Sequence, residues 1–162
     1  MRIFISLVIV GAIFLGFLAI ALIRTASHDP DLWHVDPRTV AAPDTPNWHL
    51  VADPEIATAT PHSPAPVYAA SPVVLAEAFD NFVLRQRDTQ RIAGRPVDQW
   101  MTYVQRTEAV KFPDYISVVF YELEEGRSTL AIFSRSRYGY GDLGVNGERV
   151  EGWLGTLQSF EE

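Results

Sequence analysis

The sequence has no cysteine, and all four of its histidines fall within residues 25–65. The lack of cysteine excludes disulfides, thiolate nucleophiles and cysteine-based zinc sites, and it leaves the redox compartment undetermined. Basic residues are also scarce, with 13 against 20 acidic ones and a formal net charge of −7. This charge argues against nucleic-acid binding, which needs a basic surface. The 162 residues are enough for one domain.

Only one long apolar run is present, from Ile3 to Ile23, and Ser6 alone interrupts it. As a helix it is about 32 Å long, which matches the roughly 30 Å of a bilayer core. The alternative is a cleavable signal peptide, whose apolar region is usually about 7–15 residues long and is followed by small residues. Because this run is longer and ends at Arg24, we expect residues 1–24 to be an uncleaved transmembrane anchor, embedded through residues 3–23.

The charges beside this run give a weak signal for its orientation. Arg2 and the N-terminal amine precede it, and Arg24 follows it. Positive charge favours the cytoplasmic side, so the N-terminus is expected inside. We therefore expect a single-pass membrane protein whose globular domain is periplasmic, if the source is a Gram-negative bacterium.

Residues 25–65 are expected to form a proline-rich extended linker, because seven of the eleven prolines lie there. Fully extended, this segment could reach on the order of 120 Å. Two of its residues suggest contacts: Trp33 at the membrane interface and Trp48 docked on the folded domain. The four histidines are widely spaced, which predicts solvent-exposed linker residues and no metal site.

From residue 66 to residue 162 the pattern is that of a globular domain. Ser71-Pro72 is typical of a helix start, and apolar residues recur at helical spacing to about Leu84. The arginines that follow could form a basic patch, but a solvated edge is commoner. Alternating residues then predict strands over residues 99–107, 115–123 and 129–135. A final amphipathic helix is marked by Val150, Trp153, Leu154 and Leu157.

This order predicts an α+β fold, with an antiparallel sheet of about four to five strands and two helices on one face. The helices would cover Ile116, Val118, Phe120, Leu130 and Ile132. The other face is unusually apolar for an open one, since it carries Tyr115, Val119, Tyr121, Ala131, Phe133 and Arg135. We expect the linker tryptophans, a protein partner or a lipid-like ligand to cover it.

Residues 134–146 join the last strand to the last helix and hold the best candidate site. Gly139 to Gly144 spells GxGxxG, but a dinucleotide site needs a further strand, and none follows. A glycine-rich backbone before a helix can instead bind an anion, with arginines adding contacts. The candidate ligand-binding residues are Arg135, Arg137, Tyr138, Tyr140, Asp142, Asn146 and Arg149.

A structural interpretation of the same residues stays open, and it is the commoner outcome. In it Asp142 pairs with one of the arginines and caps the last helix, while Asn146 satisfies further amides. The tyrosines then pack over the helix and stack on no ligand.

Several short motifs occur in a fixed order: Pro46-Asn47, Ala70-Ser71-Pro72, Phe112-Pro113-Asp114, Ser134-Arg135-Ser136-Arg137, Gly139, Asp142-Leu143-Gly144-Val145-Asn146, Arg149-Val150 and Trp153-Leu154. Together they resemble the family called domain of unknown function 1499, over about residues 44–158. Two positions depart from it: Trp48, where relatives often have cysteine, and Gly141, where they often have serine. No established activity comes with the family, so the resemblance implies the fold boundaries and no mechanism.

Catalysis has little support, because the folded part has no histidine and no GxSxG elbow. We expect no catalytic residue, metal or cofactor. The expected function is a membrane-anchored extracytoplasmic binding or accessory module, whose anionic or lipid-like ligand contacts Arg135 and Arg137. One alternative is an accessory subunit of a larger membrane complex that uses the open sheet face. Another is an enzyme of unknown reaction that uses Asp142 with Arg135 or Arg137.

Overall fold

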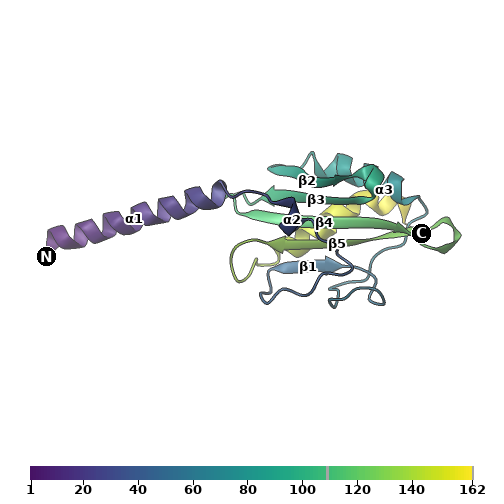
Figure 1. Ribbon diagram of the computed structural model, residues 1–162, viewed down its shortest axis with the longest axis horizontal. Helices are drawn as coiled ribbons and strands as arrows, with labels where there is room; N and C mark the ends of the chain where they lie inside the picture. The colour runs from purple at the N-terminus through teal and green to yellow at the C-terminus, as the bar shows by residue number, and fades with distance from the viewer. Residues whose placement is uncertain (109, 162) are drawn as a thin grey trace.

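The computed structural model describes residues 1–108 and 110–161. A five-stranded antiparallel sheet in the order β1-β5-β4-β3-β2 forms its centre (Figure 1). The elements in chain order are α1 (Arg2–Arg24), α2 (Pro30–Trp33), β1 (Trp48–Val51), α3 (Pro72–Val83), β2 (Thr89–Arg95), η1 (Pro96–Asp98), β3 (Trp100–Arg106), β4 (Pro113–Glu122), η2 (Glu124–Gly126), β5 (Ser128–Ser136), α4 (Val145–Leu154) and η3 (Gly155–Phe160). The fold is α+β, as the sequence predicts.

The N-terminal apolar helix is present as α1, which projects away from the rest of the chain (Figure 1). Its residues Phe4–Arg24 are long and apolar enough to cross a membrane, and none of them is buried in the protein. A helix of this kind near the N-terminus fits either a membrane anchor or a signal sequence. We call the remaining described residues, from 27 to 161, the body.

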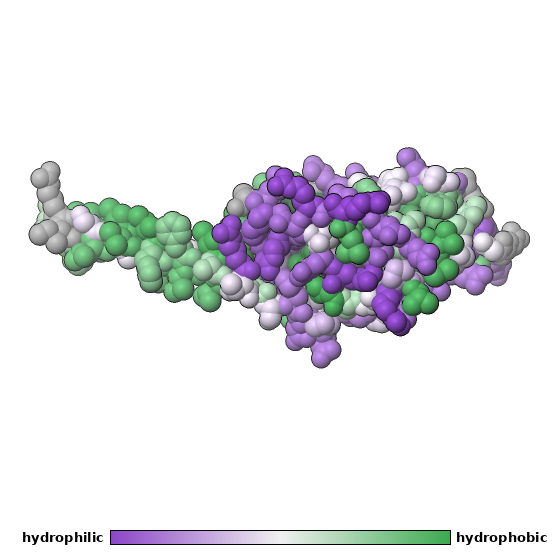
Figure 2. Space-filling model, turned by 90° about the horizontal axis from the view of Figure 1, so that it is seen from above, coloured by the Kyte–Doolittle hydropathy of each residue, from purple (hydrophilic) through white to green (hydrophobic). Residues whose placement is uncertain are grey.

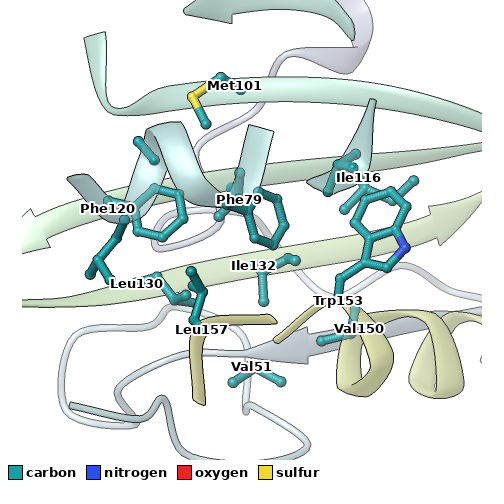
Figure 3. Close-up of a cluster of buried hydrophobic side chains, with 14 of the residues drawn as sticks. Val51, Phe79, Met101, Ile116, Phe120, Leu130, Ile132, Val150, Trp153 and Leu157 are labelled. Carbon is teal, nitrogen blue, oxygen red and sulfur yellow. The ribbon is translucent and has the colours of Figure 1, made fainter. Parts of the chain in front are cut away.

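Helices α3 and α4 cover one face of the sheet and close its main core (Figure 3). The buried residues of α3 include Leu75, Phe79 and Val83, which recur every four residues along one helix face. Val150 and Trp153 of α4 pack into the same cluster. The predicted inward residues of the strands are confirmed, because the cluster also contains Ile116, Val118, Phe120, Leu130 and Ile132.

The opposite face of the sheet is covered by the segment that the sequence assigns to an extended linker. Residues 27–40, which we call the strap, run across this face and include the short helix α2. Trp33 stacks on Tyr115 with ring centroids 3.6 Å apart, and Val35 and Val40 pack beside Phe133. Residues 25–65 are therefore largely part of the body and not a free extended linker, since burial of their apolar side chains favours docking on the sheet.

The same segment also supplies the strand β1, which the sequence does not reveal. β1 pairs with β5 along one edge of the sheet, from Trp48 opposite Arg135 to Val51 opposite Ile132. Of the two contacts suggested for the tryptophans, docking of Trp48 is confirmed. Trp33 lies on the sheet, with 9% of its surface exposed, and not free at a membrane interface.

Two further differences from the predicted elements concern polar or short segments. Residues 89–95 form the edge strand β2, whose pairing with β3 shifts register between Arg91 and Ala93. Its composition is polar because an edge strand has one open side. Val67 to Ala70 form an apolar run that could be a short strand, and around Tyr68 the chain makes isolated bridges with Ser128 and Glu161.

Candidate functional site

The candidate residues lie at the end of the sheet from which α1 emerges (Figure 1). β3 and β5 end here and β4 begins here, as the pairings Gln105↔Asp114 and Asp114↔Ser136 show. The loop of residues 137–144 and the first turn of α4 complete this end. We call it the α1 end of the body.

The alternation of side chains along β5 divides the candidate residues between two faces. Ser134 donates to Asn146 on the helix side, with an oxygen–oxygen distance of 2.6 Å. Arg135 and Arg137 point to the strap side, where both guanidinium groups lie over the ring of Trp33, at 4.6 and 5.6 Å. The predicted ligand residues therefore do not converge on one site.

On the strap side, the two arginines hold the strap on the sheet. Arg135 donates to the carbonyl oxygen of Leu32 at 3.2 Å. Arg137 donates to the carbonyl of Ser27 at 2.8 Å and to the Tyr115 hydroxyl at 3.2 Å. Burial lowers the pKa of Arg135, but an arginine remains charged at any physiological pH. Both arginines thus bind this chain's own backbone.

On the helix side, Asp142 caps α4 through backbone and side-chain N–H groups of the helix start. Its carboxylate accepts from the backbone N–H groups of Asn146 at 2.8 Å and Gly144 at 3.2 Å, and from the Asn146 side chain at 2.7 Å. Partial burial opposes its charge, but these donors hold the pKa of Asp142 below its ordinary value. The predicted cap is confirmed. The predicted pair of Asp142 with an arginine is wrong, because Arg135 and Arg137 bind the strap and Arg149 binds Asp114.

Arg149 forms a buried ion pair with Asp114, a residue outside the set of candidate ligand-binding residues. Its Nη2 lies 2.6 Å from the carboxylate, and the two side chains are 5% and 3% exposed. Arg149 also donates to Gln105 at 2.6 Å and to Ser134 and Asn146 at 3.1 and 2.7 Å. Burial raises the pKa of Asp114, and Arg149 offsets part of that rise. This network fixes α4 to β3, β4 and β5.

Asn47 ties the segment before β1 to the same corner. Its side-chain amide donates to the carbonyl of Gly139 at 2.7 Å, and its own carbonyl accepts from Asn146 at 3.0 Å. Asn47 and Asp114 both lie in motifs that the sequence shows, Pro46-Asn47 and Phe112-Pro113-Asp114. The available signal was the place of these two polar residues in the motifs, directly after prolines. Their partners, 99 and 35 residues away, are not visible in a sequence.

An open pocket of about 600 Å³ lies beside this network at the α1 end. Its charged lining residues are three arginines, Arg87, Arg106 and Arg149, and three carboxylates, Asp88, Glu108 and Glu148. Its neutral lining residues are Gln86, Gln105, Thr107 and Val145. A second hollow of about 300 Å³ shares Asp88 and Arg106 with it. Viewed from the β2 side, hydrophilic residues gather over the part of the body nearest the apolar α1 (Figure 2).

A profile of the family described as protein of unknown function (DUF1499) matches residues 36–157. The chain belongs to this family. No match to a curated protein is found. In this DUF1499 member the matched range contains β1, the whole sheet and the network of Asp114 and Arg149, whereas α1 and the first part of the strap precede it.

In this DUF1499 member, two candidate tyrosines occupy different environments. Tyr138 is half-buried and packs against Phe112, with ring centroids 6.1 Å apart. Tyr140 is 75% exposed, and the neighbouring Leu143 is fully exposed. Among residues 1–108 and 110–161, no group of three or more His, Asp or Glu residues could hold a metal ion.

Three of the four histidines of this DUF1499 member are half-buried, so the expectation of exposed linker residues is wrong for them; His62 is exposed. His28 Nε2 faces Arg106 Nη2 at 3.0 Å and can only accept, since a guanidinium only donates. The ring is therefore neutral, and its Nδ1–H donates to the Tyr115 hydroxyl at 2.8 Å. His28 therefore holds the strap on the sheet through hydrogen bonds to Tyr115 and Arg106.

The strap is expected to loosen in mild acid. Burial, then Arg106 and Arg137, lower the pKa of His28, and burial lowers that of His34. The unfolded chain then binds more protons than the folded one, so stability falls as the pH drops below about 6.5. Urea unfolding followed by circular dichroism between pH 7.5 and 5.5 measures this decline. The His28→Gln variant should show a shallower decline, and an identical slope in both proteins would contradict the assignment.

Proposed function

We propose that this protein is a membrane-anchored extracytoplasmic binding module that receives a phosphate-bearing lipid headgroup in the pocket at its α1 end. In this proposal α1 is an uncleaved anchor and the body lies in the periplasm. The ligand chemistry follows from the pocket, and the lipid source follows from its position relative to α1.

The observation that carries the proposal is the short connection between α1 and the body. α1 ends at Arg24, and the carbonyl of Ser27 already accepts from Arg137. Three residues span at most about 11 Å. If α1 crosses a bilayer, the α1 end of the body is held beside the headgroups and does not hang on a long linker.

The charges of the pocket support a phosphate ligand that also carries polar groups. Arg87 is exposed and pairs with the exposed Glu108 at 3.2 Å, an arrangement that is weak in water and easily exchanged for another anion. Arg106 lies between the two hollows. Arginine suits phosphate because its planar fork donates two parallel hydrogen bonds. The ligand contact expected of Arg135 and Arg137 is assigned here to Arg87. Arg106 lines the pocket as well, but it already donates to His28 and to the carbonyl of Lys111.

The two other functions considered from the sequence have less support from the geometry. The strap already covers the sheet face expected to bind a protein partner, so a partner there would have to displace Trp33 and Val35. An enzyme using Asp142 needs a free carboxylate near an arginine, whereas Asp142 is engaged in the α4 cap.

Substitution of Arg87 by glutamine should reduce lipid binding without affecting the fold, because its side chain is 84% exposed. The full-length protein, extracted in mild detergent, is analysed by native mass spectrometry after titration with phosphatidylglycerol and phosphatidylethanolamine. A several-fold loss of bound lipid is expected for Arg87→Gln, as for removal of a charge-assisted hydrogen bond. The matched control is Arg85→Gln, an exposed arginine outside the pocket. Equal lipid binding by both variants, or no bound lipid in the parent protein, would overturn the proposal.

A further inference from the structure

The loop between β5 and α4 exposes two large side chains with apolar surface, Tyr140 and Leu143. Leu143 is 101% exposed and Tyr140 is 75% exposed. Leu143 also has a left-handed backbone conformation, with φ of 56°, which is unfavourable for any residue with a β-carbon. A leucine at this position does not stabilise the fold, because its side chain is not buried and its β-carbon disfavours the left-handed backbone conformation.

The loop that carries these side chains is firmly held. Asn47 binds the carbonyl of Gly139 at 2.7 Å, and Asp142 accepts from Gly144 and Asn146. Tyr138 packs against Phe112. Tyr140 and Leu143 therefore project from a fixed base, and their exposure is not a consequence of an unattached loop.

The position of the loop near the end of α1 indicates that a membrane is the partner of its exposed side chains. The loop starts at Arg137, the residue whose guanidinium binds the carbonyl of Ser27, three residues after the end of α1. Figure 1 shows the loop at the end of the body from which α1 emerges. Ser27 lies within about 11 Å of the end of α1 and binds the first residue of this loop. If α1 spans a bilayer, the loop therefore lies on the side of the body that faces the bilayer interface.

We infer that Tyr140 and Leu143 insert into the interface of the bilayer in which α1 is anchored, as a second attachment point of the body. Tyrosine prefers this region because its ring is apolar and its hydroxyl remains hydrated. Leucine gains there the burial that it lacks in the protein. Two attachment points, α1 and this loop, fix the orientation of the body and turn the pocket toward the headgroups. The inference rests on the proposed function only in taking α1 as an anchor.

The absence of cysteine allows a direct test by single-site spin labelling. Nitroxide labels are placed in the full-length protein at Tyr140→Cys, Leu143→Cys and Phe14→Cys, and at Val97→Cys as a control. Val97 is an exposed apolar residue in η1, at the other end of β3. The proteins are reconstituted in nanodiscs of phosphatidylethanolamine and phosphatidylglycerol. Accessibility to oxygen, relative to a water-soluble nickel complex, reports the depth of each label.

The expected result is a ratio of oxygen to nickel accessibility at residues 140 and 143 that approaches that at residue 14, whereas residue 97 gives the ratio of a label in water. Water-like ratios at 140 and 143 with a buried label at 14 would overturn the inference, leave the anchor intact and make a protein partner the occupant of the loop. A water-like ratio at 14 would overturn the anchor itself.

A second variant separates insertion from folding. Leu143→Gly removes the apolar side chain at a backbone conformation that glycine adopts readily, so the fold is not expected to suffer. In this variant the label at residue 140 should move toward water-like accessibility. An unchanged depth would show that Leu143 does not contribute to insertion.

Discussion

Replacement of Arg149 by methionine is expected to lower the free energy of unfolding by about 3–5 kcal/mol, the cost of leaving one member of a buried ion pair without its partner. The Asp114 carboxylate, 3% exposed, would lose the guanidinium that pairs with it. Ser134, Asn146 and Gln105 would lose a donor at the same time. Urea unfolding of the full-length protein, followed by circular dichroism, measures the change.

The pH dependence of this variant identifies Asp114 as the cause. Without the guanidinium, burial raises the pKa of Asp114 further. The folded state then holds a proton that the unfolded state has lost. The difference in free energy of unfolding between the variant and the parent protein should therefore become smaller as the pH falls from 7 toward 5.

The control for the Arg149 variant is Arg95→Met, which removes an exposed pair. Arg95 and Asp98 are 69% and 47% exposed, and pairs of this kind contribute about 0–1 kcal/mol. Equal losses in the Arg149 and Arg95 variants would contradict the view that the network fixes α4 to the sheet.

Replacement of Trp33 by alanine is expected to cost about 3–5 kcal/mol and to free the strap. The ring stacks on Tyr115 at 3.6 Å, and the guanidinium of Arg135 lies over it, 4.6 Å from its centroid. Hydrogen exchange should then rise across residues 27–40, and unfolding by urea should begin at lower concentration. Exchange within β4 should rise less, because β3 and β5 flank it on both sides.

Leu32→Ala provides the matched control for Trp33→Ala, because Leu32 lies on the same short helix and is 58% exposed. This control should change stability by no more than about 0.5 kcal/mol. If Trp33→Ala leaves the exchange of the strap unchanged, the stacked tryptophan does not hold it.

The sequence predicts α3, α4 and the strands β3, β4 and β5 because their patterns are strong and local. Phe79 lies one helical repeat after Leu75, and Ile116, Val118 and Phe120 alternate along a strand. Such periodicities depend only on which face of an element meets the core.

The strap and β1 escape prediction because their stability comes from distant residues. Trp33 needs Tyr115, and β1 needs the free edge of β5. The prolines suggest an extended chain, and the strap is indeed mostly irregular, but it is fastened through its carbonyls. Ser117 donates to Trp33, and Trp100 donates to Val35. Local sequence carries no sign of these bonds.

The grouping of the candidate site residues could not be predicted from the sequence either. Arg135, Arg137, Asn146 and Arg149 are close in sequence, but the alternation of β5 sends the first two to the strap and leaves the others on the helix side. Proximity along a chain therefore did not mean a shared site. The pocket draws on Arg87 and Arg106, which the candidate set does not include.

Neutron reflectometry of the full-length protein in a supported bilayer tests most directly whether the strap holds the body against the membrane. The structure predicts protein density that begins within about 10 Å of the headgroups, because only three residues separate Arg24 from the bound Ser27. A free linker of residues 25–65 could instead extend on the order of 120 Å. A hydrated gap of several tens of ångströms, of the kind such a linker permits, would contradict the account.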